Sequence, residues 1–195
     1  MRKFLFVVAL YSLFCIPAVA ETPRVEIYGG YGFLHDTGIT LHGFQAAVEG
    51  NINNYISIVG EFGFNRKDVT EDARLFTDLF ETEGTIENAD LKSFTILAGP
   101  RVSFRREGVR PFAHFLLGIH RIGGSATVEG EPNSEYLNNF GMAVGGGIDI
   151  AVNSTISIRP AQIDLLSSRF KVGENNVWEK MFRFSTGIVF KFGEK

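Results

Sequence analysis

Apolar and polar side chains alternate along most of this chain with a period of two residues. The clearest example is the C-terminal segment 182–192. There, bulky apolar or threonine side chains occupy every second position, and small or charged side chains fill most of the positions between. Successive side chains of a β-strand point to opposite faces, so this period predicts a strand whose two faces meet different surroundings.

Eight segments of the chain carry this alternation, and each has about the 9–11 residues that a strand needs to cross a bilayer at a tilt. The segments are 25–34, 43–52, 55–65, 93–104, 110–122, 140–152, 155–164 and 182–192.

The connections between these segments alternate strictly between short and long. The short ones are 53–54, 105–109 and 153–154, and the long ones are 36–41, 66–91, 124–138 and 165–180. Barrels with short periplasmic turns and longer external loops have this asymmetry. The pattern predicts an all-β protein, an eight-stranded antiparallel up-and-down transmembrane β-barrel that occupies residues 21–195.

The N-terminal segment has the features of a secretory signal peptide. Arg2 and Lys3 precede an apolar run, and Ala18 and Ala20 supply the small residues that a signal peptidase requires. The run is shorter than the ~20 residues of a membrane-spanning helix. We therefore expect residues 1–20 to be cleaved. The one cysteine, Cys15, leaves with them.

The composition of the two strand faces indicates which one meets lipid. The polar face is poor in Lys and rich in Gly, Ala and Ser, whereas a water-exposed surface normally carries many charges. Small residues with a few charges suit the inside of a narrow barrel, and the Phe, Ile and Val face suits a lipid-exposed band. Phenylalanines at the strand ends predict two aromatic girdles, one of Phe33, Phe62 and Phe64 and the other of Phe104, Phe190 and Phe192. The alternative is a soluble barrel with its apolar face inside.

Charged residues recur on the inward face of the alternation. They are Glu26, Glu49, Glu61, Arg101, Arg110, Asp149, Arg159, Arg183 and Lys191. Buried charges must be paired, so these residues predict a salt-bridge network that fills the lumen. In that network we expect Arg101 and Arg159 to pair with Glu49, Glu61 or Asp149. The alternative is the selectivity lining or gate of a narrow channel.

The seventh segment breaks its alternation at Pro160. A β-bulge there would turn Gln162 and Asp164 into the lumen and Ile163 outward, since a bulge tolerates the missing donor of proline. The alternative is that both polar residues lie at the rim.

No catalytic, cofactor or metal motif stands out in the sequence. The four histidines are His35, His42, His114 and His120, and none lies near the C-terminus beside a serine. There is no phosphate loop or metal-ligand cluster. The net charge of −3 gives no electrostatic reason to expect that the protein binds nucleic acid. We therefore expect a protein that is not an enzyme and has no cofactor.

The C-terminal stretch S-T-G-I-V-F-K-F resembles the assembly signal of outer-membrane barrels. Its signal positions are Ser185, Gly187, Phe190 and Phe192, although Gly193, Glu194 and Lys195 follow the aromatic residue that usually ends the chain. With the signal peptide and the eight strands, it makes the chain resemble the small outer-membrane β-barrel superfamily, which includes the OmpA-like transmembrane domain and its porin-like relatives.

That resemblance implies a monomer in the bacterial outer membrane, whose partners are outer-membrane lipid, lipopolysaccharide and the barrel-assembly machinery. The expected role is structural, adhesive or surface-interacting, without catalysis. A narrow passive channel for small solutes and a soluble periplasmic ligand-binding barrel are the alternatives.

Overall fold

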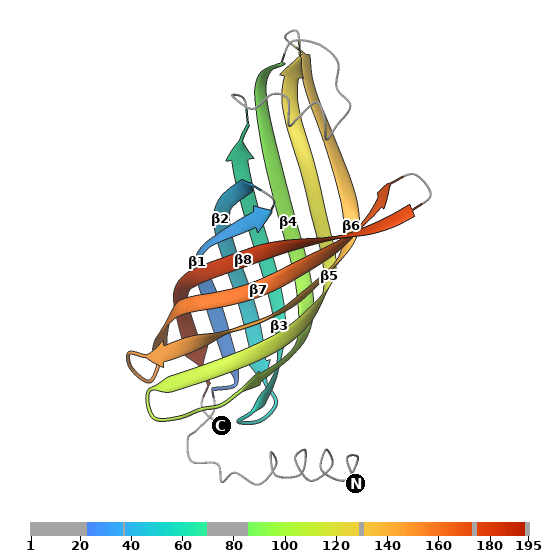
Figure 1. The fold of residues 1–195 in the computed structure, drawn as a ribbon. Helices are drawn as coiled ribbons and strands as arrows, with labels where there is room; N and C mark the ends of the chain where they lie inside the picture. The colour runs from blue at the N-terminus through green and yellow to red at the C-terminus, as the bar shows by residue number, and fades with distance from the viewer. Residues whose placement is uncertain (1–22, 37, 70–85, 129–130, 173–174, 194–195) are drawn as a thin grey trace, which may run out of the picture.

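The chain folds into a single closed β-barrel (Figure 1). The computed structural model describes residues 23–36, 38–69, 86–128, 131–172 and 175–193. Each strand pairs antiparallel with the next, and β1 pairs with β8. The strands are β1 (Val25–Asp36), β2 (Ile39–Asn51), β3 (Ile56–Asp68), β4 (Ile86–Ser103), β5 (Val109–Val128), β6 (Glu131–Ala151), β7 (Ile156–Val172) and β8 (Asn175–Phe192). The eight-stranded antiparallel barrel is thus confirmed, while the predicted signal peptide lies outside the described residues.

The described part of the chain contains no helix that is long and apolar enough to cross a membrane.

Tight turns join the strands at one end of the barrel, where β1 begins and β8 ends. In the β2–β3 turn, the Asn53 side-chain oxygen accepts hydrogen bonds from the backbone N–H groups of Tyr55 and Ile56. Asn153 does the same in the β6–β7 turn. Asparagine supplies this local acceptor more readily than most residues, which fixes both turns. These short connections agree with the sequence prediction and define the periplasmic end.

The strands extend much further at the opposite end than the alternation predicted. β5 and β6 remain paired as far as Val128 and Glu131, and β7 and β8 as far as Val172 and Asn175. The predicted long loops 124–138 and 165–180 are therefore wrong. Beyond the bilayer neither face meets lipid, so the sequence loses its alternation although the backbone ladder continues.

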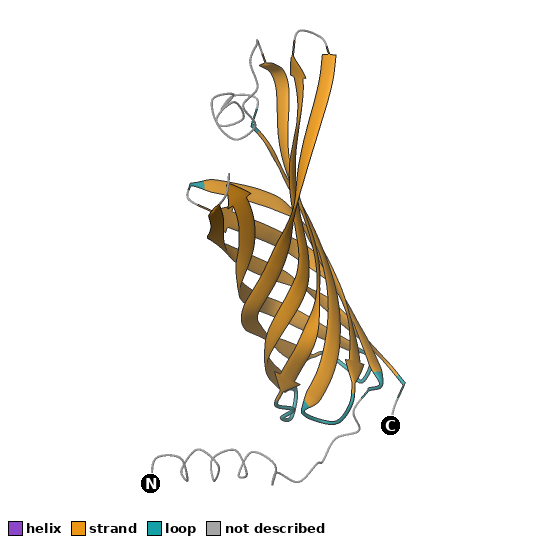
Figure 2. Ribbon diagram, turned by 90° about the vertical axis from the view of Figure 1, so that its right-hand side faces the viewer, coloured by secondary structure: helices purple, strands orange, loops and turns teal. Residues whose placement is uncertain are grey.

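Part of this extension forms a separate sheet. The external ends of β4, β5 and β6 rise together above the rim of the barrel, whereas the end of the β7–β8 hairpin turns away (Figures 1 and 2). The pairing of β6 with β7 stops at Phe140 and Arg169, while β6 continues to pair with β5. We call the external ends of β4, β5 and β6 the projecting sheet.

The outer surface of the barrel is an apolar band. Ile96 is 62% exposed, Val144 51% and Ile188 45%, whereas their inward neighbours Leu97, Ala143 and Val189 are buried. Aromatic rings pack together near the external end of the band, as Phe64 does on Phe94 with ring centroids 4.8 Å apart. An outward face this apolar is stable in lipid, not in water.

A collar of basic residues lies directly beyond this band on the external side. Seven strands contribute the first outward-facing polar side chain above the apolar band, and β7 contributes Arg169, which follows the outward but buried Ser167. Seven of the eight side chains are basic. The collar consists of His35, His42, Arg66, Lys92, Arg121, Asn138, Arg169 and Lys180.

The pairing of the strands shows that the collar is level. Some collar residues pair directly with the collar residue of the neighbouring strand, as His42 does with Arg66. The others pair with the residue that lies two positions from the neighbouring collar residue towards the periplasmic end, as Arg121 does with Phe94. The stagger always runs in the same direction, which is what a level ring on tilted strands produces. The collar therefore marks one height around the barrel.

The inside–outside assignment can be tested at Val144, which faces outward near the middle of β6. Val144→Arg should lower the free energy of unfolding in phospholipid vesicles by about 2–4 kcal/mol, because the charge would enter the bilayer core. Val144→Leu is the matched control and should leave stability nearly unchanged. Equal stability of the arginine variant and the wild type would show that this face does not meet lipid.

Candidate functional site

The lumen of the barrel is filled by an extended network of ion pairs. Five arginines and five carboxylates take part, and all are buried except Arg105, which is partly exposed at the periplasmic mouth. The members are Arg101, Arg105, Arg110, Arg159, Arg183, Glu26, Glu49, Glu61, Asp149 and Asp164. Equal numbers of positive and negative groups leave the network neutral. Neutrality is a condition for burying so many charges together.

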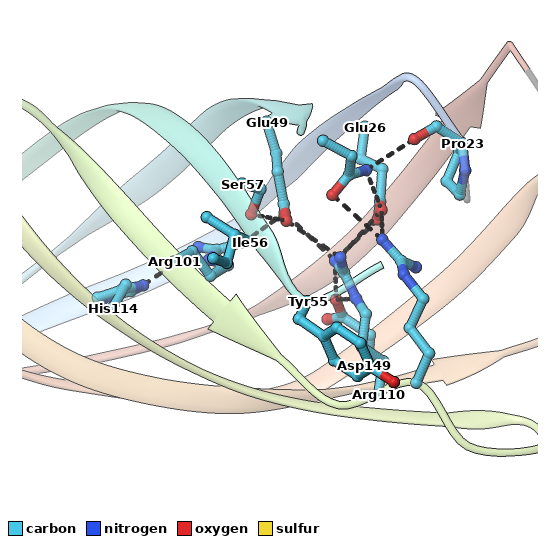
Figure 3. A network of polar contacts seen from close by, with 12 residues as sticks. Pro23, Glu26, Glu49, Tyr55, Ile56, Ser57, Arg101, Arg110, His114 and Asp149 are labelled. Carbon is cyan, nitrogen blue, oxygen red and sulfur yellow. Dashed lines mark hydrogen bonds and ion pairs between the residues drawn. The ribbon is translucent and has the colours of Figure 1, made fainter. Parts of the chain in front are cut away.

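Arg110 is the centre of the periplasmic half of this network (Figure 3). Its Nη2 lies 2.8 Å from Oε2 of Glu26 and 2.7 Å from Oδ2 of Asp149. Its Nη1 lies 3.1 Å from Oε1 of Glu49, and the other oxygen of Glu49, Oε2, accepts a 2.7 Å hydrogen bond from Arg101. The guanidinium thus joins β1, β2 and β6 to β5 across the lumen. Its planar donors suit several carboxylates at once.

Arg183 and Gln162 organise the middle of the lumen. Arg183 lies 2.5 Å from Glu61 and 2.6 Å from Asp164. Gln162 accepts a 2.7 Å hydrogen bond from Arg159 and donates to both Glu61 and Asp164. The amide therefore connects the ion pair of Arg159 to those of Arg183.

A β-bulge brings two of these groups into the lumen. The register of β7 with β8 shifts between Arg159 and Gln162, the segment that contains Pro160. As a result Gln162 and Asp164 are buried inside, and Ile163 is 50% exposed to lipid. The bulge predicted from the sequence is confirmed, and the alternative of a rim position is wrong.

His114 extends the network as a neutral ring. Its Nδ1 lies 3.2 Å from Nη2 of Arg101, which can only donate, so Nδ1 must accept. The ring proton then lies on Nε2 and is donated to Asp164 over 2.8 Å. His114 thus links Arg101 to Asp164 without adding a charge.

Aromatic rings separate the arginines from one another. The ring of Phe112 lies between Arg101 and Arg159, with guanidinium carbons 4.1 and 4.4 Å from its centroid, and Arg159 also lies 4.3 Å from the ring of Tyr28. Cation–π attraction stabilises such stacks in a desolvated site. Glycines make room for them: a Cβ on Gly147 would lie 2.8 Å from the Phe112 ring, and one on Gly145 only 2.0 Å from Asp164.

The structure brings together eight of the nine interior residues named from the sequence. Lys191 is the exception, because it is only partly buried and forms no ion pair within the described residues. It lines a cavity of about 370 Å³ at the periplasmic mouth, together with Arg105, Arg110 and Asp149.

Sequence reasoning missed three polar members of the network. Arg105 was assigned to a turn, yet its side chain reaches 2.7 Å from Glu26. The predicted bulge placed Asp164 in the lumen without a partner, and His114 was named only as one of the four histidines. The groups that meet across the lumen depend on the stagger of the barrel, which the alternation along single strands does not specify.

An apolar layer lies above the ion pairs towards the external end. Leu97, Leu116, Ala143 and Leu166 are almost completely buried there. His120, above them, has no solvent exposure, and its nitrogens lie 2.9 Å from Ser93 and 2.5 Å from Ser168. These contacts join β4, β5 and β7, and no substrate can reach them. Among the described residues, no group of His, Cys or carboxylate side chains is arranged to hold a metal.

The segment that resembles an assembly signal lies in the closing strand β8. Phe190 and Phe192 face outward and are 41% and 48% exposed, and Ser185 is buried inside. Gly187 approaches β1 closely, since a Cβ there would lie 2.3 Å from the carbonyl oxygen of Gly29. The role of this segment in assembly stays a prediction.

A filled lumen and a lipid-compatible exterior define a transmembrane β-barrel, and comparison with known proteins agrees. Residues 6–190 match the family described as outer membrane protein beta-barrel domain. The chain belongs to this family and is a protein of the bacterial outer membrane. A comparison with curated proteins finds no match.

Two solved structures show the same fold. The chain is similar to Ail, the attachment invasion locus protein of Yersinia pestis, with a TM-score of 0.56 and 19% identity over 88% of this chain and 99% of that one. It is also similar to Neisserial surface protein A, with a TM-score of 0.53 and 15% identity over 86% and 96% of the two chains. At these identities the likeness concerns the fold.

The ion network can be tested at Arg183, which is within ion-pair distance of both Glu61 and Asp164. Arg183→Met should destabilise the folded barrel by about 3–5 kcal/mol, because two buried carboxylates lose their cation. Adding Glu61→Gln and Asp164→Asn should recover most of the loss, since the remaining groups are neutral. Chemical unfolding in vesicles measures both effects. A single variant as stable as the wild type would contradict the buried network.

Proposed function

We propose that this protein is a non-conducting outer-membrane barrel that presents the projecting sheet as an interaction surface and has no catalytic activity. The observation that carries the proposal is the closure of the lumen. Ion pairs fill its periplasmic half and middle, and the apolar layer of Leu97, Leu116, Ala143 and Leu166 lies above them. A solute would have to break buried ion pairs and enter an apolar layer.

The projecting sheet supports the surface role. Within the described residues, β6 between 131 and 139 pairs with β5 on one side and with no strand on the other. An unpaired strand edge offers backbone donors and acceptors to an extended segment of another protein. Leu137 on this strand is 46% exposed, and Val177 and Trp178 of the neighbouring hairpin are 44% and 47% exposed. Strand edge and apolar side chains together suit a protein partner.

The structure of Ail was solved with a heparin analogue, sucrose octasulfate. Because its likeness to this chain is one of fold, it suggests a probe for binding experiments. It does not identify a ligand.

The proposed role predicts that the protein conducts no ions across planar lipid bilayers. The wild-type barrel should produce no single-channel steps, because buried ion pairs and the apolar layer fill its lumen. Regular conductance steps from the wild-type protein would favour the channel alternative.

The surface role can be tested on cells that display the protein. The control replaces 124–135 by Asn-Gly, which keeps the pair Gly123–Tyr136 and closes the shortened hairpin with a two-residue turn. Cells with the full chain should adhere to epithelial monolayers or heparin-coated wells, and cells with the shortened chain should not. If cells with equal amounts of the full and the shortened chain on their surface adhered equally well, the projecting sheet would not be the interaction surface.

A further inference from the structure

The outer surface of the barrel holds a groove directly below the basic collar. The groove spans β3 to β6 and has a volume of about 490 Å³. Its floor is apolar and consists of Phe62, Phe94, Ile96 and Ile119. These side chains belong to the lipid-facing band, so the floor meets hydrocarbon chains and not water.

The external edge of the groove is polar and contains one exposed cation in a fixed position. Arg121 stacks over the ring of Tyr136, with its guanidinium carbon 4.4 Å from the ring centroid. Its strand partners are Phe94 in the floor and Asn138 at the edge. The aromatic contact fixes the direction of the guanidinium while leaving its N–H donors available.

Arg121 differs from most arginines of the barrel because no carboxylate among the described side chains neutralises it. Within the described part of the chain it forms no ion pair, whereas the lumen arginines all do and Arg66 of the collar lies 2.8 Å from Asp90. An exposed guanidinium at the membrane surface is free to bind an anion from its surroundings. The groove therefore combines an apolar floor with a guanidinium at its end that pairs with no described carboxylate.

The height of the groove along the barrel shows which part of the membrane surrounds it. The collar lies at the external edge of the continuous apolar band, on the side of the long strand extensions, so it lies in the headgroup region of the outer leaflet. The collar contains no carboxylate among its eight residues. Its charge thus complements a leaflet whose lipids carry phosphate at this depth.

We propose that this groove binds one lipid A moiety of lipopolysaccharide. Arg121 donates to a phosphate of the glucosamine headgroup, Asn138 donates to a neighbouring oxygen, and an acyl chain lies along Phe94, Ile96 and Ile119. Arginine is suited to this role because its planar fork makes two parallel hydrogen bonds to phosphate. Other collar residues contribute longer-range attraction without forming the site. This inference goes beyond the proposed surface role and does not depend on it.

Binding of lipid A to the full folded chain tests the proposal. The protein in neutral detergent is titrated with hexa-acylated, bisphosphorylated lipid A, and native mass spectrometry measures the bound fraction. The wild type should retain one lipid A saturably. Arg121→Gln should weaken binding by about tenfold or more, the loss expected for a charge-assisted pair. The matched control, Lys180→Gln, removes a collar charge on β8 and should change affinity by less than about twofold.

Two further experiments distinguish the contribution of the lipid A headgroup from that of its acyl chain. Ile119→Trp fills the groove but keeps Arg121, and it should weaken binding as strongly as Arg121→Gln. Dephosphorylated lipid A and phosphatidylglycerol should bind the wild type more weakly than lipid A, and inorganic phosphate should not compete. Unheated electrophoresis in SDS verifies that each variant is folded.

Equal losses from Arg121→Gln and Lys180→Gln would overturn the proposal, because the collar would then act as diffuse charge. Equal affinity for phosphatidylglycerol would overturn it as well, because the groove would then be a general lipid contact.

Discussion

The burial of nine charged side chains in a narrow lumen is the constraint on which the rest of this barrel depends. An isolated charge in such a site is too costly to persist, so every arginine must meet carboxylates from other strands. Arg110 reaches Glu26, Glu49 and Asp149, and Arg183 reaches Glu61 and Asp164. These contacts cross the barrel and connect strands that are distant in the sheet, which the backbone ladder alone does not do.

The same constraint explains details of the backbone. The bulge between Arg159 and Gln162 turns Asp164 inward, where it pairs with Arg183 and His114. Glycines face the bulkiest inward groups, since a side chain at Gly145 would collide with Asp164. Phe112 and Tyr28 fill the space between guanidinium groups that would otherwise repel one another. The filled lumen supports the proposal that solutes do not pass through the barrel and that its function lies on the outer and external surface.

Alternation along the strands predicted the inner and outer faces well, because lipid and lumen impose opposite demands on neighbouring residues. Phe190 and Lys191 illustrate it, one exposed on the band and one at the inner mouth. The same signal failed beyond the membrane. Residues 124–138 looked like a loop because water meets both faces there, yet β5 and β6 remain paired almost throughout. Contacts across the lumen, such as that of Arg105 with Glu26, could not be predicted because they depend on the stagger of a closed sheet.

The basic collar shows another limit of sequence reasoning. Its members lie at unrelated positions in the sequence, and only the strand register reveals that they share one height.

The exclusion of water from the lumen is the claim that supports most of this account. Hydrogen exchange at the arginine side chains, followed by NMR in lipid nanodiscs at neutral pH, tests it most directly. The Nε–H groups of Arg110, Arg159 and Arg183 each donate to a buried carboxylate and should remain visible and exchange slowly. Rapid exchange of all three with bulk water would show a hydrated lumen and contradict the account.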